Sequence, residues 1–347
     1  MKELKILIVL IVFTLITYIG IEPFAHSQMS PHVAPANFNY EQEDIDLAKV
    51  RIEEAKAALQ KAEIALAANA TNENLKNAVE SAKNDVQIRE NDLEAYQELW
   101  AQAGEIAALK GNAESGAELF MACTACHGLK SQGFEPPFDD ASSSEAYGVV
   151  VPDLSLAGAV YDKKFLSALI INPTQALKLS KKFTDENPFP MTQFFGFGED
   201  LNQEVADIVA YLQSVAPQNI SSKEVFETAC LRCHDVRYDA LYATTEKSAL
   251  KGYMGSNPPD LSIMIRARGA EYLENFINDP QKKLDGTAMP RVGLTEEYTQ
   301  KTVGYLEQIG DSKKGERTTI GIGMIVFFVF MAFFAYMWKR EVWKELH

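Results

Sequence analysis

The sequence predicts an all-α protein with two tandem domains, a helical hairpin inserted before them and a transmembrane helix at each end. Three observations lead to this expectation. Apolar residues gather at the two ends of the chain, a heptad pattern runs through residues 41–110, and a pattern of about 100 residues then occurs twice. The 347 residues leave room for two or three domains. The formal net charge is −15, and we expect no nucleic-acid partner for so acidic a chain.

The apolar run near the C-terminus, residues 318–338, is long enough to span a membrane, for which about 20 largely apolar residues suffice. Lys339, Arg340 and Lys344 follow the run, and basic residues favour the cytoplasmic side of a membrane. We therefore expect a C-terminal transmembrane helix whose end lies in the cytoplasm.

The apolar run near the N-terminus lies within residues 1–22. Lys2 and Lys5 precede its core, and Ala25-His26-Ser27 could serve as a cleavage site, so the segment is either a membrane anchor or a removed signal peptide. The run is longer than a usual signal-peptide core, which favours a retained anchor.

Residues 41–110 carry apolar side chains at alternating spacings of three and four, as in a coiled-coil seam. One seam covers residues 45–66 and a second covers residues 75–100, with a break at Arg89. The short polar segment 69–72 between them predicts an antiparallel helical hairpin. Its 8 basic and 15 acidic side chains give a net charge of −7. The hairpin is either a solvated spacer or a docking arm for a partner subunit, and the seam does not decide between these roles.

The four cysteines form two Cys-x-x-Cys pairs, and a histidine directly follows each pair. This spacing attaches c-type haem, because the two thiols form thioethers with the haem vinyl groups and the histidine supplies a nitrogen to the iron. We therefore expect two covalently bound haem c groups. The attachment residues are Cys123, Cys126, Cys230 and Cys233, and the axial histidines are His127 and His234.

Two other interpretations of the cysteine pairs deserve comparison. The pairs could together bind one zinc ion, or each could act as a thioredoxin-like dithiol. Neither alternative requires a histidine directly after each pair, and only five histidines occur in the chain. The repeated placement of histidine therefore favours haem.

The two motifs lie at matching places in an internal repeat, whose copies we call the first repeat (residues 112–217) and the second repeat (residues 218–317). In each copy a helical stretch leads into the motif, and Pro-Asp-Leu-Ser follows it. An amphipathic stretch ending in Asn-Pro or Asp-Pro comes next, then a methionine in a Pro-flanked loop, then a helix containing Tyr-Leu. This order of elements resembles the all-α cytochrome c fold.

The repeat also points to the sixth ligand of each iron, because electron-transfer haems usually hold iron between histidine and methionine. Met191, in Pro188-Phe-Pro-Met191, is the only methionine between the first motif and residue 253. Met289, in Gly286-Thr-Ala-Met289-Pro290, matches it in the second repeat, while Met254 and Met264 fit the repeat register less well. We predict Met191 and Met289 as ligands; the alternative is that they only fill a core.

The three remaining histidines follow no such pattern. Two of them lie just outside the first apolar run and the third ends the chain. We expect surface or interfacial roles for all three: His26, His32 and His347.

Two stretches of the second repeat carry a family resemblance. Residues 230–241 read Cys-Leu-Arg-Cys-His-Asp-Val-Arg-Tyr-Asp-Ala-Leu, with Arg-Tyr-x-x-Leu after the motif, and residues 258–269 contain Pro-Pro-Asp-Leu-Ser and Ala-Arg-x-Gly. Both are similar to cytochrome c1, the haem subunit of the quinol–cytochrome c reductase (cytochrome bc1) complex, as is the C-terminal Lys339-Arg340-x-x-Trp343. The added haem domain, hairpin and N-terminal run depart from the mitochondrial type and resemble the dihaem variant of some bacteria.

The resemblance implies a role for one arginine of the second stretch. In that family an arginine pairs with a haem propionate, which by position would be Arg268, with Arg266 as the alternative. A guanidinium group suits such a pair because it binds a carboxylate through two parallel hydrogen bonds. The other interpretation is an ordinary surface arginine.

The resemblance further implies an electron-transfer subunit with no substrate-converting site of its own. Its partners would be cytochrome b, a Rieske iron–sulfur protein, the lipid membrane, and a soluble cytochrome c or terminal oxidase. We expect it in the bacterial inner membrane with its haem domains in the periplasm. The alternatives are the dihaem subunit of a cbb3-type oxidase, for which an N-terminal anchor alone is expected, and a dihaem peroxidase, which needs one open iron site. The acceptor, the quinone type, the potentials and the order of the haems stay open.

Overall fold

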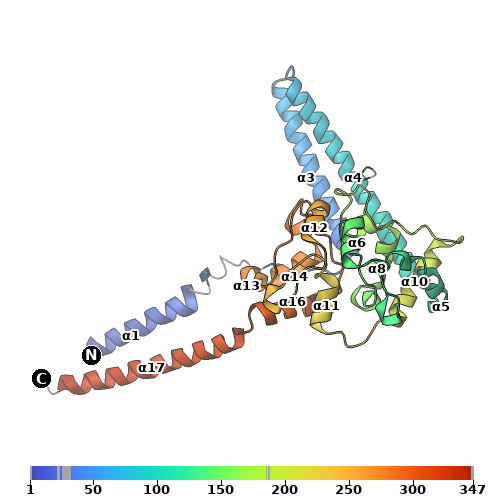
Figure 1. The fold of residues 1–347 in the computed structure, drawn as a ribbon. Coiled ribbons are helices and arrows are strands. Elements are labelled where there is room, and N and C mark those ends of the chain that lie inside the picture. Colours follow the sequence, from blue (N-terminus) through green and yellow to red (C-terminus); the bar gives the residue numbers. More distant parts are fainter. Residues whose placement is uncertain (1, 22–23, 26–32, 185, 187, 345–347) are drawn as a thin grey trace.

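A computed structural model describes residues 2–21, 24–25, 33–184, 186 and 188–344. Helices dominate these residues, and no strand occurs among them apart from isolated β-bridges. The all-α expectation is therefore confirmed for this part of the chain. In Figure 1 the terminal helices extend from one side of the molecule, a long helical arm projects from another, and shorter helices make up the rest.

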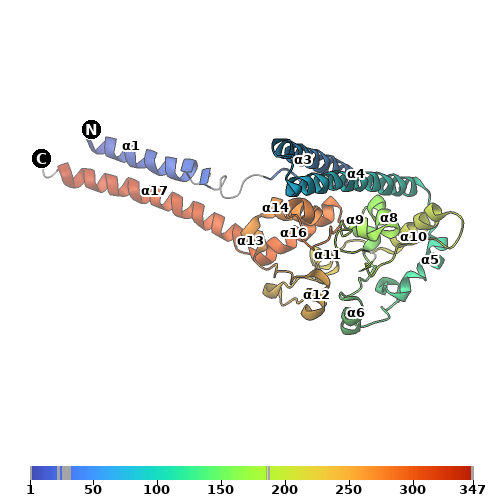
Figure 2. The same ribbon diagram turned by 90° about the horizontal axis from the view of Figure 1, so that it is seen from above.

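The helices at the two ends extend away from the rest of the molecule. α1 (Lys2–Leu15) continues as the π-helical η1 (Ile16–Ile21), and α17 covers Lys314–Lys344. They run side by side in both views (Figures 1 and 2), and each is long and apolar enough to cross a membrane. The architecture is thus compatible with membrane anchoring. His26, His32, His347 and most of the candidate cleavage site lie outside the described residues.

The arm consists of α3 (Tyr40–Ala68) and α4 (Glu73–Ala108), which pack along each other in opposite directions (Figure 1). Asn39 and Asn72 begin the two helices, because each side chain accepts a hydrogen bond from a backbone N–H in the first turn. Buried residues concentrate where the arm meets the repeats: Tyr40, Asp44, Ala48, Ile52 and Ala55 on α3, and Leu99, Trp100, Ala103 and Ile106 on α4. We call residues 40–108 the hairpin.

The helices of the first repeat recur in the same order in the second repeat. The first series is α5 (Ala113–Phe120), η3 (Lys130–Gln132), α6 (Asp140–Tyr147), α7 (Ala157–Val160), α8 (Lys163–Ile171), α9 (Pro173–Ala176) and α10 (Leu201–Val215). The second series is α11 (Ser222–Ala229), η4 (Arg237–Asp239), α12 (Lys247–Met254), α13 (Met264–Arg268), α14 (Ala270–Asn278), α15 (Pro280–Lys283) and α16 (Glu296–Gly310). The local sequence explains part of the match: Asn172 and Asp279 cap α9 and α15, each with proline in the first turn.

Each series encloses a core of apolar side chains. In the first repeat α5 crosses α10 so closely that a Cβ atom on Gly116 would lie 2.0 Å from the carbonyl oxygen of Asp207. The hairpin completes this core, since Trp100 and Ile106 of α4 belong to it. The second core is built on α11, α14 and α16 and also includes Val160 of the first repeat. The two repeats and the hairpin therefore pack as one body.

Candidate functional site

The first Cys-x-x-Cys-His motif forms a tight turn directly after α5. Cys123–Ala125 is the 3₁₀ turn η2, and the N–H groups of Cys126 and His127 donate to the Cys123 carbonyl at 3.1 and 2.8 Å. The Nδ1 atom of His127 lies 2.9 Å from the carbonyl oxygen of Pro152.

The second motif forms the same turn after α11. The N–H groups of Cys233 and His234 both donate to the Cys230 carbonyl at 3.0 Å. The Nδ1 atom of His234 lies 2.8 Å from the carbonyl oxygen of Pro259. In both repeats the histidine and its carbonyl partner are 25 residues apart.

These contacts fix the tautomer of both imidazoles. A carbonyl oxygen can only accept, so Nδ1 must carry the proton and Nε2 keeps the lone pair that binds a metal. Burial lowers the pKa of His127 and of His234 below the ordinary value, which favours the neutral ring. In each repeat the protein thus holds Nδ1 of the histidine and leaves Nε2 as the nitrogen that could bind a metal.

The cysteines suit thioether attachment better than the alternatives. None of them is in a disulfide, and burial raises the pKa of Cys123 to about 11 and that of Cys230 to about 12. A thioredoxin-like dithiol needs the opposite shift. Among the described residues no group of three or more His, Cys, Asp or Glu side chains could hold a metal ion, so the two pairs do not meet in one zinc site. The residues present fit a covalently attached haem at each motif.

The Pro-Asp-Leu-Ser segments hold the histidine-binding carbonyls in place. Leu154 N–H donates to the Gly128 carbonyl, and Leu261 N–H donates to the Asp235 carbonyl, each at 2.9 Å. The aspartate and serine side chains accept from the backbone just after each motif: Asp153 from Lys130, Ser155 from Ser131, Asp260 from Arg237 and Ser262 from Tyr238. Sequence reasoning found these segments as repeat markers but missed this bracing role.

Met191 lies in an exposed loop, residues 188–198, which we call the first methionine loop. The Met191 side chain is half-buried, but Phe195 and Phe197 in the same loop are 79% and 69% exposed. Two sets of contacts hold the loop. Phe194 N–H donates to the Ile170 carbonyl at 3.1 Å, and the Glu204 carboxylate accepts from the N–H groups of Phe197 and Gly198 at 2.7 and 2.5 Å.

Met289 lies in residues 286–295, the second methionine loop, which packs between the hairpin and the first repeat. Gln281 Nε2 donates to the Met289 carbonyl at 2.6 Å, and Arg291 N–H donates to the Leu177 carbonyl at 3.1 Å. Farther along, Thr295 N–H donates to the Val160 carbonyl at 3.1 Å. Contacts from both repeats therefore hold this loop.

A cluster of four buried charged side chains joins the second methionine loop, through Arg291, to the hairpin and to the first repeat. Arg291 donates to both oxygens of Asp44 at 2.8 and 2.5 Å and to Asp279 at 3.2 Å. Lys178 of the first repeat pairs with Asp44 at 2.9 Å and also with Asp279. Sequence reasoning missed this cluster; its only local sign is the aspartate at 279 where the first repeat has Asn172.

The remaining candidate residues lie around the second repeat. Met254 ends α12 and is buried, with its Sδ atom 3.8 Å from Lys182 Nζ, while Met264 is half-buried at the start of α13. Arg266 and Arg268 are exposed on α13, and the Arg268 guanidinium lies 5.4 Å from the ring centre of Tyr272.

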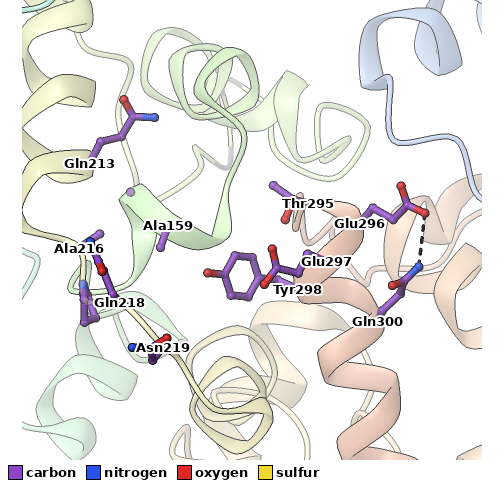
Figure 3. Close-up of a pocket in the computed structure, with 12 residues that line it drawn as sticks. Ala159, Gln213, Ala216, Gln218, Asn219, Thr295, Glu296, Glu297, Tyr298 and Gln300 are labelled. Atoms are coloured by element: carbon purple, nitrogen blue, oxygen red, sulfur yellow. Dashed lines mark hydrogen bonds between the residues drawn. The ribbon is translucent and has the colours of Figure 1, made fainter.

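An open cavity of about 880 Å³ lies where the two repeats join, between the end of α10 and the start of α16 (Figure 3). Gln213, Gln218 and Tyr298 are among its lining residues, and none of the predicted haem-binding residues is. A second cavity, of about 510 Å³, is lined by the base of the hairpin, Lys178–Lys182, Met254 and the start of the second methionine loop. Only the second cavity is close to the candidate site.

Comparison with known proteins identifies the first repeat. The family model for cytochrome c matches residues 113–216. This part of the chain carries a cytochrome c domain. Such a domain implies covalently bound haem c and a role in haem electron transfer, and the matched segment contains the Cys123–His127 turn.

Two further similarities cover smaller shares of the chain. The ammonia monooxygenase gamma subunit of Nitrosomonas europaea is 26% identical over 147 residues, covering 31% of this chain and 63% of that protein. The chain thus matches less than two thirds of that relative. A chain of a solved hyperthermophilic respiratory complex III is 25% identical, with a TM-score of 0.31, over 36% of this chain and 75% of the other.

Proposed function

We propose that the chain is a dihaem c-type cytochrome subunit of a quinol–cytochrome c reductase of the bc1 type. It takes electrons from a Rieske iron–sulfur protein and passes them to a soluble cytochrome c or a terminal oxidase. The observation that carries the proposal is the duplicated histidine geometry: His234 is held by the Pro259 carbonyl at 2.8 Å as His127 is held by the Pro152 carbonyl at 2.9 Å. The second repeat therefore has the arrangement of the cytochrome c domain beside it.

Bound haem supplies a one-electron couple, and the chain's residues hold and tune it. The paired cysteines tether each group, while the carbonyl partner of each histidine makes its ring a stronger ligand. Met191 and Met289 are the proposed sixth ligands, and Arg268 or Arg266 the proposed partner of a propionate. In the second repeat the contact between Met254 and Lys182 supports Met289 over Met254.

The placement of the repeats supports an order of transfer. The second repeat carries the cytochrome c1-like stretches and is joined to α17 through residues 311–313. It also has 14 basic and 15 acidic side chains, for a net charge of −1, whereas the first repeat has 6 basic and 14 acidic, for a net charge of −8. We place the Rieske protein at the second repeat and a basic soluble acceptor at the acidic first repeat, where opposite charge raises the association rate.

The first test is the number of haem groups and the identity of the partners. Mass spectrometry of the denatured protein should show two covalent haem additions, and the solubilised protein should co-purify with a cytochrome b and a Rieske protein. One haem addition would remove the second site. Two haems in a preparation that instead contains an oxidase core would favour the cbb3-type alternative, and a high-spin ferric haem would favour a peroxidase.

The second test concerns the membrane. We propose that both terminal helices stay in the inner membrane, with both chain ends in the cytoplasm and residues 40–310 in the periplasm. Reporter fusions at the two ends should both read as cytoplasmic. A mature protein beginning near residue 28 would show that the first apolar run is a signal peptide, and would leave α17 as the anchor.

The order of transfer is tested by rapid mixing with quinol. A Met191→Ala variant, whose first haem has too low a potential to accept electrons, should still reduce the second haem promptly while the external acceptor is starved. A second haem that stays oxidised until the first is reduced would reverse the order.

A further inference from the structure

We propose that Asp44, at the base of the hairpin, positions the second methionine loop through Arg291 and thereby sets the reduction potential of the second haem. The hairpin then supports the loop that carries a haem ligand. The inference rests on the proposed function in one respect, the assignment of Met289 as the sixth ligand.

The charged groups that join the hairpin to the second methionine loop are buried. The side chains of Asp44 and Arg291 are both fully buried, and they meet through two parallel hydrogen bonds. Burial opposes ionisation of Asp44, yet Arg291 and Lys178 hold the pKa of its carboxyl below the ordinary value. Arg291 also donates to Asp279 at 3.2 Å, so the buried guanidinium faces two carboxylates. These contacts favour a permanently charged pair of Asp44 and Arg291.

Further contacts restrain the ion pair between Asp44 and Arg291. Trp100 Nε1 donates to Asp44 Oδ2 at 2.9 Å, so the carboxylate is held from both helices of the hairpin. The Arg291 guanidinium lies 4.8 Å from the ring centre of Tyr40. Lys178 reaches the cluster from a left-handed backbone conformation, φ 57°, which a lysine adopts only when its surroundings compensate the strain.

The distance along the chain from Arg291 to the proposed ligand is short. Only Pro290 separates Arg291 from Met289, and the ring of proline fixes the backbone φ angle between them. On the other side of Arg291, Tyr40 Oη donates to the Leu294 carbonyl at 2.5 Å, and a Cβ atom on Gly293 would lie 2.0 Å from the Phe165 ring. The loop after Met289 is therefore pinned by the hairpin and by the first repeat.

The consequence concerns one haem. Without the Asp44 carboxylate, Arg291 and Lys178 remain buried with Asp279 as their single counter-charge, and the loop must move to relieve this imbalance. A longer or broken bond from methionine sulfur to iron lowers the potential, because methionine ligation favours the reduced state. The first methionine loop has no contact with the hairpin of this kind, so the first haem should be unaffected.

The experiment uses the full-length protein in detergent with both haems attached, and compares Asp44→Asn with Glu43→Gln. Glu43 is the neighbouring residue on α3 and also pairs with the second repeat, through Lys282 at 2.6 Å, but at the surface. Reduction potentials come from a spectroelectrochemical titration, and the near-infrared methionine-to-iron band reports ligation. Met289→Ala and Met191→Ala assign each potential and band to its haem.

We expect Asp44→Asn to shift the reduced-to-oxidised ratio of the second haem at least tenfold at a fixed potential, which is 59 mV for a one-electron couple. Its near-infrared band should weaken, and Glu43→Gln should leave both haems unchanged. Asp44→Glu should restore part of the shift. A variant that does not accumulate can be replaced by Trp100→Phe, which removes the hydrogen bond to Asp44 together with part of a buried ring, and which should shift the same haem in the same direction.

The outcomes separate the inference from the function on which it rests. Unchanged potentials in Asp44→Asn, or in Trp100→Phe where that substitute is used, would overturn the positioning role and leave the dihaem proposal standing. An equal shift of both haems would overturn it as well, since a general loss of packing would act on both. A near-infrared band that survives Met289→Ala would overturn the ligand assignment together with the positioning role.

Discussion

The two repeats hold their histidines alike but their methionine loops differently. In both, a turn within the motif and a carbonyl 25 residues later hold the imidazole ring of the histidine. The first methionine loop is largely exposed and is held by Ile170 and Glu204 of its own repeat, whereas the second is buried from Arg291 to Leu294 and is held by the hairpin and the first repeat. The comparison teaches that the motif orients its histidine locally, while distant parts of the chain position the loop that carries the proposed methionine ligand of the second repeat.

The largest expected effect follows from removing Arg291. Arg291→Met leaves Asp44 and Asp279 buried with Lys178 as their single counter-charge, and breaking a buried ion pair in this way costs about 3–5 kcal/mol of unfolding free energy. The measurement is urea unfolding in detergent with haem absorbance as the probe. The matched control is Gln193→Met, two residues after Met191, where the exposed side chain should change stability by less than about 0.5 kcal/mol. Equal effects at the two positions would break the comparison.

A middle-sized effect is expected from an added ligand. Imidazole competes with methionine for iron, and displacing Met191 moves an exposed loop, whereas displacing Met289 disturbs the buried cluster. Imidazole should therefore bind the first haem about tenfold more tightly, a difference of about 1.4 kcal/mol. Spectral titration of the ferric protein should show two phases, and the tighter one should be altered in Met191→Ala. A single phase, or the reverse order, would contradict the distinction between the loops.

The smallest effect is expected at Glu204. Glu204→Ala removes the carboxylate that accepts from the N–H groups of Phe197 and Gly198. The unfolding free energy should fall by only about 1 kcal/mol, because both N–H groups can donate to water instead. Proteolysis of the folded protein should speed up within residues 188–198 and stay unchanged within residues 286–295. Faster cleavage in both loops would show that they are coupled.

Sequence patterns predicted those features of the molecule that are determined by short segments of the chain. The Cys-x-x-Cys-His motifs, the ends of α8 and α14 at Asn172 and Asp279, and the all-α class follow from residues that are close in the sequence. The heptad pattern found Ala48 and Ile52 on the buried face of α3. It could not find Asp44, because a search for apolar positions passes over a charged residue.

The cluster around Asp44 shows why the rest stayed hidden. Its ion pair joins residues 247 positions apart, and its other members come from the first repeat and from the cap of α15. Each charge alone looks like an ordinary surface residue in the sequence, and only the packing of three parts brings them together. The sequence suggested either a spacer or a docking arm for the hairpin. Both roles concern its exposed half and not its buried base.

The joint between the second repeat and α17 has a consequence for how partners meet. Only residues 311–313 separate α16 from α17. The Arg317 guanidinium bridges this link, because it donates two hydrogen bonds to Asp311 at 2.6 and 3.0 Å. The 31 residues of α17 measure about 46 Å at 1.5 Å per residue, more than the roughly 30 Å of a bilayer's hydrocarbon core. With residues 318–338 in the membrane as proposed, residues 314–317 extend the helix by about 6 Å on the side of the second repeat and form a short, stiff pedestal.

A stiff pedestal keeps the second repeat at one height above the bilayer. A donor that is anchored in the same membrane then searches for it in two dimensions and at a high effective concentration, so their contact can be weak and brief. The first repeat gains nothing from this confinement when its partner diffuses freely in solution, and must rely on long-range attraction for its encounters.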